Sequence, residues 1–167
     1  MIRGITSSWK QLIYYDFDTD MSKEILYDII GKVEAAGFLV VAMVCDLGPT
    51  NIRLWNSIGV NVNQTSFINP AASDRSIYVF ADVPHLIKLI RNNFLDWGFN
   101  VGETTNISSA CVRELVLRSV HDLKTAHRLS HQHIDVSGVK RMNVKLAAQL
   151  LSETTAKTLK YFGQQGL

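Results

Sequence analysis

Two aspartates stand where apolar segments of strand length end, and they are the side chains best placed to do chemistry. Asp46 follows the run Phe38 to Cys45, and Asp82 follows the run Ser76 to Ala81. Carboxylates at strand ends can hold divalent metal ions, and two Mg²⁺ ions about 3.5–4 Å apart assist phosphoryl transfer. Asp46 is therefore a candidate metal ligand, with capping of the next helix as its alternative role. For Asp82, which directly precedes a helix, capping is the favoured interpretation.

Other polar side chains give weaker signals. His127 and His131 are four residues apart, with His121 and His133 nearby, but no acid lies between them as in HExxH, so zinc is disfavoured. Neither GxxxxGK[ST] nor GxGxxG occurs, so motifs alone predict no nucleotide site. The remaining candidates are interpreted as structural, turn or solvated residues, although the basic ones could touch phosphates: His85, Asp16, Asp18, Asp20, Lys88, Arg91, Lys140, Arg141 and Lys145.

The elements that would position Asp46 are a strand, a helix and a second strand. Residues Lys10 to Asp16 predict the first strand, and Ser22 to Ala36 have apolar side chains at helical spacing. Ser22 and Asp20 are both candidate N-caps. The run Phe38 to Cys45 is continuously apolar, which is typical of a strand covered on both faces. This order predicts a right-handed βαβ crossover in a mixed α/β sheet, with Asp46 at the carboxyl end of a central strand.

Later segments predict a change of architecture. Asn51 to Ile58 could form a short helix, residues 61–75 are polar and predict a loop, and Ser76 to Ala81 predict a third strand. Pro84 would open a helix over His85 to Trp97. Beyond Gly98 only helices are expected, roughly Ala110 to Leu129 and Val139 to Phe162, with no strand. We therefore expect an α/β domain over residues 1–97 and a helical domain over residues 98–167.

Composition sets broad limits on function. The 167 residues are 47% hydrophobic and 19% charged, which is typical of a globular protein. A net charge of +2 permits contact with nucleic acid but falls short of the basic bias of a dedicated DNA-binding module. Cys45 and Cys111 form no CxxC pair, so neither a disulfide framework nor a zinc ribbon is indicated. With no apolar signal core or membrane-length stretch, we expect a soluble intracellular protein.

Six stretches of the sequence, in this order along the chain, resemble the P-element transposase family, which includes its THAP-domain relatives in animals. The resemblance covers essentially the whole chain and is more specific than any single motif. The stretches are Ile2-Arg-Gly-Ile-Thr-Ser-Ser-Trp-Lys-Gln, Tyr14-Tyr-Asp-Phe-Asp-Thr, Val44-Cys-Asp-Leu-Gly, Asn51 with Leu54-Trp55, Phe80-Ala-Asp-Val-Pro-His-Leu-Ile-Lys-Leu-Ile-Arg-Asn, and Asn143-Val-Lys-Leu-Ala-Ala-Gln-Leu-Leu-Ser.

The resemblance implies a partial RNase H-like mixed sheet followed by part of a mainly helical GTP-binding insertion domain. It implies a DDE-type acidic triad that binds Mg²⁺ and cuts and joins DNA, with GTP as a cofactor for assembling DNA ends. Asp46 matches the second acid of that triad, as catalytic residue and metal ligand. The guanine nucleotide contacts should fall on Asp122, Arg128 and Val144, with Lys124 and Lys145 nearby. Arg128 would serve phosphate oxygens, and Asp122 would accept hydrogen bonds from guanine or ribose.

The sequence also departs from the family pattern. The first triad acid would lie upstream of Met1 and the third beyond Leu167, and the zinc-coordinating THAP domain is absent. We therefore expect no strand transfer and no site-specific DNA binding from this chain alone. A complete protein would act on transposon ends in the nucleus, as a homo-oligomer. Two alternatives stay open: a degenerate or domesticated domain with a non-catalytic binding role, and a small α/β nucleotide-binding domain unrelated to transposition.

Overall fold

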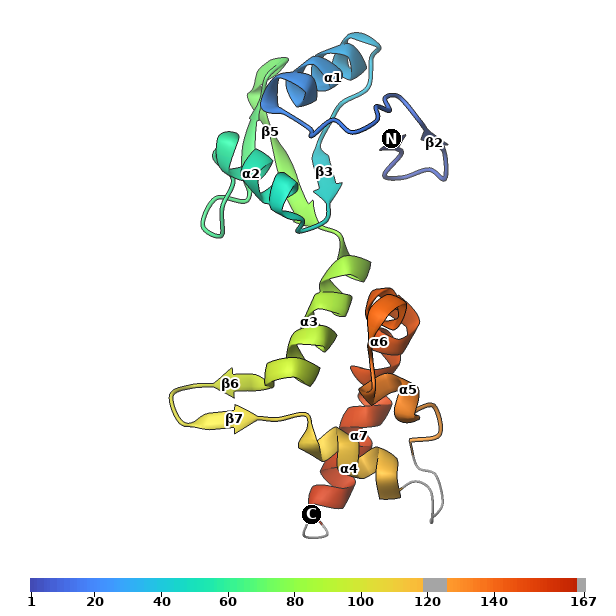
Figure 1. The fold of residues 1–167 in the computed structure, drawn as a ribbon. Coiled ribbons are helices and arrows are strands. Elements are labelled where there is room, and N and C mark those ends of the chain that lie inside the picture. The colour runs from blue at the N-terminus through green and yellow to red at the C-terminus, as the bar shows by residue number, and fades with distance from the viewer. Residues whose placement is uncertain (119–125, 165–167) are drawn as a thin grey trace. The chain divides into compact units, whose positions relative to one another are not determined.

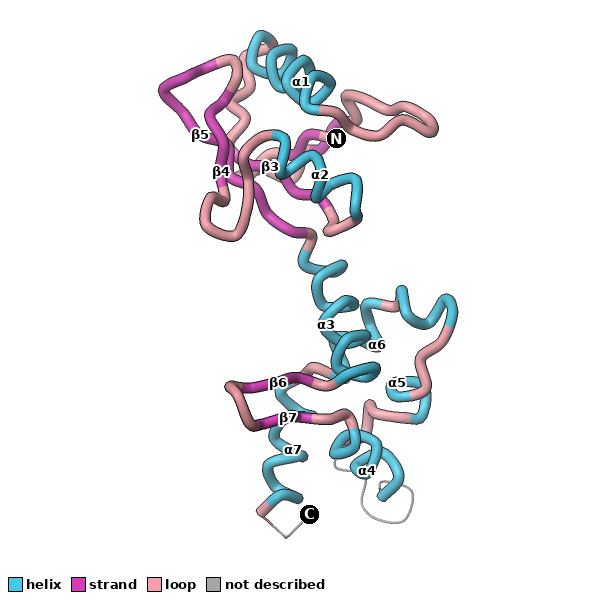
Figure 2. Tube along the Cα trace, turned by 60° about the vertical axis from the view of Figure 1, so that its left-hand side comes forward, coloured by secondary structure: helices cyan, strands magenta, loops and turns pink. Residues whose placement is uncertain are grey.

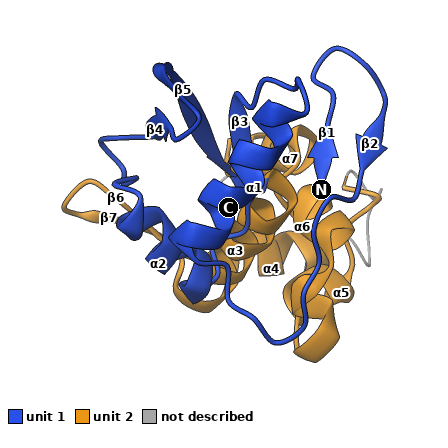
Figure 3. Cartoon of the chain, turned by 90° about the horizontal axis from the view of Figure 1, so that it is seen from above, with its two compact units in different colours: residues 1–82 blue, residues 83–167 orange. Residues whose placement is uncertain are grey.

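A computed structural model describes residues 1–118 and 126–164 and divides the chain into two compact units, Met1–Asp82 and Val83–Leu167 (Figure 3). Each unit has its own hydrophobic core. No helix among the described residues is long and apolar enough to span a bilayer.

The first unit is a mixed α/β fold (Figure 1). Its helices and strands are β1 (Ile2–Arg3), β2 (Lys10–Gln11), α1 (Lys23–Ala35), β3 (Ala42–Cys45), α2 (Pro49–Ser57), β4 (Ser66–Asn69) and β5 (Ala72–Ala81). The strands β1 and β2 pair antiparallel with each other. The main sheet has the order β3-β5-β4, with β3 parallel and β4 antiparallel to β5.

This topology corrects several details of the sequence analysis. The strand expected over Lys10 to Asp16 is only β2, and β2 pairs with β1 and not with β3, so the expected βαβ crossover is wrong. The parallel partner of β3 is β5, which follows α2 and β4 along the chain. The strand β4 lies within the segment that was predicted to be a loop, and β5 begins at Ala72 instead of Ser76.

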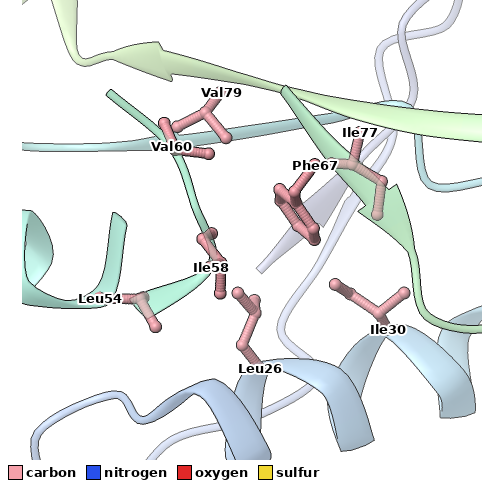
Figure 4. Packing of buried hydrophobic residues seen from close by; sticks show 8 residues of the cluster. All are labelled: Leu26, Ile30, Leu54, Ile58, Val60, Phe67, Ile77 and Val79. Atoms are coloured by element: carbon pink, nitrogen blue, oxygen red, sulfur yellow. The ribbon is translucent and has the colours of Figure 1, made fainter. Parts of the chain in front are cut away.

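One face of the main sheet is buried against α1 and α2. Ile77 of β5, which has no exposed surface, packs in this core with Phe67 of β4 and Leu26 of α1 (Figure 4). The opposite face exposes four large apolar side chains: Val44, Ile68, Tyr78 and Phe80. Strand alternation explains the division, because neighbouring residues of β5 point to opposite faces of the sheet.

A side-chain cap fixes the start of α1, and a carboxylate near its end binds residues of the sheet. Ser22 is its N-cap, as one of the two expected candidates, and the Ser22 hydroxyl accepts a hydrogen bond from the backbone N–H of Ile25 (3.3 Å). Near its end, Glu34 accepts hydrogen bonds from Arg75 (2.7 Å), from Asn69 (2.8 Å) and from the backbone N–H of Val40 (2.8 Å). These hydrogen bonds, that from Arg75 foremost, lower the pKa of Glu34 to about 2.

The second unit is mainly helical but contains a β-hairpin that the sequence analysis missed (Figure 2). The hairpin pairs Phe99 with Ile107. The expectation that no strand follows Gly98 is therefore wrong. Gly98 permits the turn into it with φ +76°, and a Cβ there would lie 2.5 Å from the carbonyl oxygen of Ile107. The elements are α3 (Val83–Trp97), β6 (Phe99–Val101), β7 (Thr105–Ile107), α4 (Ala110–Arg118), α5 (His131–Ile134), the 3-10 helix η1 (Gly138–Met142), α6 (Val144–Leu150) and α7 (Glu153–Gly163).

The helix α3 belongs to the second unit, although the sequence analysis grouped it with residues 1–97. Its Phe94 packs in the second core, with Val112 of α4 and Leu150 of α6. Its Arg91, which has no exposed surface, donates hydrogen bonds to the carbonyl oxygens of Lys140 (3.3 Å) and Arg141 (2.9 Å). These contacts place the division between the compact units after Asp82.

Candidate functional site

Asp46 and Asp82 leave the main sheet at equivalent positions of two neighbouring parallel strands. Cys45, the last residue of β3, lies opposite Ala81, the last residue of β5. The backbone N–H of Asp82 donates to the carbonyl oxygen of Cys45 at 2.8 Å, which extends the ladder to the aspartates themselves. Asp46 and Asp82 were each expected at the end of a strand, and the structure confirms both placements.

The turn after β3 holds Asp46 by its side chain. The Oδ1 atom of Asp46 accepts hydrogen bonds from the backbone N–H of Gly48 and from the amide of Asn51, both at 2.8 Å. A Cβ at position 48 would lie 2.9 Å from that oxygen, so a larger residue there would displace the Asp46 carboxylate. Asp46 thus has a structural role at the start of α2, and its side chain is also exposed enough to meet a ligand.

The described residues do not form a complete metal site. Across residues 1–118 and 126–164, no group of three or more His, Cys, Asp or Glu side chains could hold an ion. Mg²⁺ takes an octahedral set of oxygen ligands and keeps several waters. Asp46 and Asp82 supply two carboxylates at one sheet edge, which is at most part of such a set.

The second unit contains a pocket of about 300 Å³ beside α6 and the start of α7. Two cations line it, Arg128 and Lys145, and both side chains are exposed. None of the described lining residues is acidic. The other lining residues are hydroxyl, amide or apolar: Ala126, Leu129, Ala148, Gln149, Ser152, Thr154 and Thr155.

Two N-caps divide the stretch beside this pocket into α6 and α7. This stretch was expected to be one helix. The Oδ1 atom of Asn143 accepts from the backbone N–H of Leu146 (3.1 Å) and starts α6. The hydroxyl of Ser152 accepts from the backbone N–H of Thr155 (3.3 Å) and starts α7. Side-chain caps at Asn and Ser let a chain end one helix and begin another. The expectation of a continuous helix over Val139 to Phe162 is therefore wrong.

The residues predicted to bind the nucleotide lie in different places. Arg128 and Lys145 line the same pocket. Val144 is the first residue of α6 but does not line the pocket. Asp122 and Lys124 lie outside the described residues. The hydroxyl and amide groups of the pocket were not predicted, and the sequence signal that could have indicated them is the cap pattern at Asn143 and Ser152.

Two of the histidines, His131 and His133, contact other protein groups. His133 is buried, and its Nδ1 and Nε2 atoms lie within hydrogen-bond distance of Ser130 and Gln149. His131 is exposed and lies 3.8 Å from the carboxylate of Asp135. The arrangement of His133 is that of a buried structural histidine.

A second pocket of about 410 Å³ lies between α4 and α7. It is lined mainly by apolar groups, with Cys111 and Glu114 as its polar members. Of the predicted site residues that the structure describes, none lines this pocket.

Comparison with known proteins identifies both parts of the chain. Residues 1–59 match the family described as TNP-like, RNase H N-terminal domain, and residues 84–167 match TNP-like, GTP-binding insertion domain. The chain is 38% identical to the Transposable element P transposase of Drosophila melanogaster over 160 residues, which is 96% of this chain and 21% of that protein. It is 26% identical to the human DNA transposase THAP9, over 96% of this chain and 19% of that protein.

A solved structure agrees with these relatives. The Drosophila P element transposase strand transfer complex superposes with a TM-score of 0.92 at 36% identity, covering 99% of this chain and 37% of that one. The chain thus spans about a fifth of the length of its curated relatives. The expected fold class, a partial RNase H-like sheet followed by a mainly helical insertion domain, is confirmed.

The insertion-domain match covers half of the chain, and the resemblance noted in the sequence holds over nearly all of it. This chain belongs to the TNP-like family of proteins related to the P element transposase.

Proposed function

We propose that this chain binds GTP in the pocket that Arg128 and Lys145 line. The observation that carries the proposal is the meeting of these two cations in one pocket of the GTP-binding insertion domain. Guanidinium and ammonium groups form strong charge-assisted hydrogen bonds with phosphate oxygens. None of the described lining residues is acidic, so none of them offsets this positive charge.

The remaining lining groups suit a phosphate chain as well. Ser152 and Thr154 add hydroxyl groups, which can donate to phosphate or ribose oxygens. Asp122 stays a prediction from the family resemblance, as the residue that would accept hydrogen bonds from the guanine base. Val144 stays a predicted contact through its place at the start of α6. In this proposal GTP is a cofactor for assembling DNA ends and not a fuel.

Calorimetric titration of the chain with GTP tests the proposal. Lys145→Met and Arg128→Met should each weaken binding about ten-fold or more, because each removes a hydrogen bond from a charged donor, of about 1.5–3 kcal/mol. Lys157→Met is the matched control, because Lys157 is an exposed α7 lysine paired with Glu153 and does not line the pocket. Equal GTP affinity of all four proteins would refute the site.

A second candidate function belongs to the first unit. We propose that Asp46 is one ligand of a divalent metal in DNA cleavage and joining. The supporting observation is its exposed position at the carboxyl end of a sheet strand, in the part matched to the RNase H N-terminal domain. Because the described residues supply at most two carboxylates at that edge, further acids would have to complete the site.

Paramagnetic Mn²⁺ can probe Asp46 directly. Nuclear magnetic resonance signals of residues 46–48 should broaden on adding Mn²⁺, and Asp46→Asn should abolish the broadening. Asp28→Asn is the control, because Asp28 is exposed on α1 and paired with Lys32. Broadening that persists unchanged in Asp46→Asn would contradict the assignment. The chain alone should give no strand transfer in the same buffer.

The relatives of this chain are named as transposases, and one of them forms a strand transfer complex. We propose that this chain works as part of a homo-oligomeric protein that acts on transposon-end DNA in the nucleus. Fluorescence microscopy of the tagged chain and crosslinking to end DNA would test location and partner separately.

A further inference from the structure

Gln149 lines the proposed GTP pocket, and a buried histidine holds its side chain by a hydrogen bond. Its Oε1 atom lies 3.0 Å from Nε2 of His133, which has 4% of its surface exposed. The backbone carbonyl of Gln149 accepts a second hydrogen bond, from the hydroxyl of Thr155 (3.1 Å), which is equally buried. Two buried polar groups therefore hold this one pocket residue.

The hydrogen bonds of His133 determine which end of the Gln149 amide is available. The backbone N–H of Ser130, which can only donate, lies 3.1 Å from Nδ1 of His133. Nδ1 is therefore the acceptor, and a neutral imidazole then carries its proton on Nε2. The Nε2–H group donates to Oε1 of Gln149, so the oxygen end of the amide is occupied.

The amide nitrogen is the end of Gln149 that a ligand can meet. In the described part of the chain, no hydrogen bond from this nitrogen to a protein group is present, and Gln149 is only half-buried. On α6, Gln149 lies one helical turn after Lys145, so both residues share one face of the helix and line the same pocket. The pocket thus presents a neutral donor next to a cation.

We propose that Gln149 donates a hydrogen bond from its side-chain amide to a phosphate oxygen of the nucleotide, and that His133 is the positioning residue that fixes this orientation. Phosphate oxygens accept hydrogen bonds, so an amide held with its nitrogen toward the ligand can donate to them. A ligand group that itself donates hydrogen bonds is disfavoured at that point. This inference rests on the proposed GTP site and adds a residue that selects for acceptor oxygens there.

GTP titration of the full chain tests the role of Gln149. Gln149→Met, which keeps the size and the helix preference, should weaken binding about ten-fold. Gln149→Glu should weaken it further, because a carboxylate would then face the phosphates. Gln132→Met is the matched control, since Gln132 is exposed on α5 and does not line the pocket.

The outcomes separate this inference from the proposed function. One outcome is that the unaltered chain binds GTP and Lys145→Met weakens this binding, whereas Gln149→Met leaves it unchanged. That outcome would refute the role of Gln149 but leave the nucleotide site standing. If the unaltered chain does not bind GTP, both proposals fall. Gln149→Glu with unchanged affinity would also overturn the inference.

A double-mutant cycle tests the positioning role of His133. His133→Phe should weaken GTP binding several-fold in the unaltered chain but cause no further loss in Gln149→Met, because it acts through Gln149. Equal losses in both backgrounds would show a general structural effect and overturn the positioning role. Circular dichroism establishes that each variant is folded, and His133→Asn replaces His133→Phe if the latter unfolds.

Discussion

Ile77 should be the side chain on which the first unit's stability depends most directly. It has no exposed surface and lies on the central strand β5, opposite Phe67. Ile77→Ala removes three carbon atoms, worth about 2.4 kcal/mol at about 0.8 kcal/mol per buried methylene. Because the rigid sheet can close the cavity only in part, we expect a total loss of about 3–4 kcal/mol, within the range of about 2–5 kcal/mol for such changes.

Urea unfolding followed by tryptophan fluorescence measures this loss. The Trp97→Phe background leaves Trp9 and Trp55 as reporters, and both lie in the first unit. Ile68→Ala is the matched control: Ile68 lies on the neighbouring strand β4 but is 58% exposed on the opposite face, so its loss should stay below about 1 kcal/mol. Equal losses for Ile68→Ala and Ile77→Ala would refute the assignment of the buried face.

Three further predictions concern other parts of the chain. Because the folded pKa of Glu34 is about 2, below its usual 4.5, its stabilising effect is complete above pH 4.5 and is lost as pH falls toward 2; acid unfolding curves should therefore be less steep for Glu34→Gln. Gly98→Ala should destabilise the second unit by about 2 kcal/mol or more in thermal unfolding, since φ is +76° and the new Cβ would meet the carbonyl oxygen of Ile107. Asn143→Ala should cost about 1 kcal/mol through loss of the α6 cap and should speed hydrogen exchange in α6, whereas unchanged exchange would contradict the capping role.

The ends of β3 and β5 were predictable because the apolar runs before them are continuous. Asp46 and Asp82 were located correctly from those runs alone, and the structure pairs the two strands in parallel. The helix α1 was predictable from its apolar spacing and its N-cap, Ser22. These sequence signals are local, so they can be recognised without knowledge of the rest of the fold.

The missed strand segments depend on distant partners. The first half of β5 is polar, and its Arg75 is paired with Glu34 of α1, 41 residues away. The strand β4 is short, and its buried Asn69 also donates a hydrogen bond to Glu34. A polar strand that is satisfied by a long-range ion pair has no periodic apolar pattern that a sequence reading could detect.

The nucleotide pocket was only partly predictable for a related reason. Arg128 and Lys145 came from the family resemblance, and the structure places them in one pocket. The role of Gln149 depends on a contact with His133 across 16 residues, which no local pattern indicates. The break between α6 and α7 depends on the Ser152 cap, which competes with continuation of the helix.

The mixed pairing of the main sheet also implies an order of folding. Only Pro70 and Ala71 separate β4 from β5, whereas Val44 of β3 pairs with Phe80, 36 residues later in the chain. Closing the longer loop costs more chain entropy, so the β4–β5 hairpin is expected to form first and to offer its free edge to β3. The candidate acid at the end of β3 is therefore expected to reach its position only after this hairpin has formed, and mutations that slow hairpin formation should delay it too.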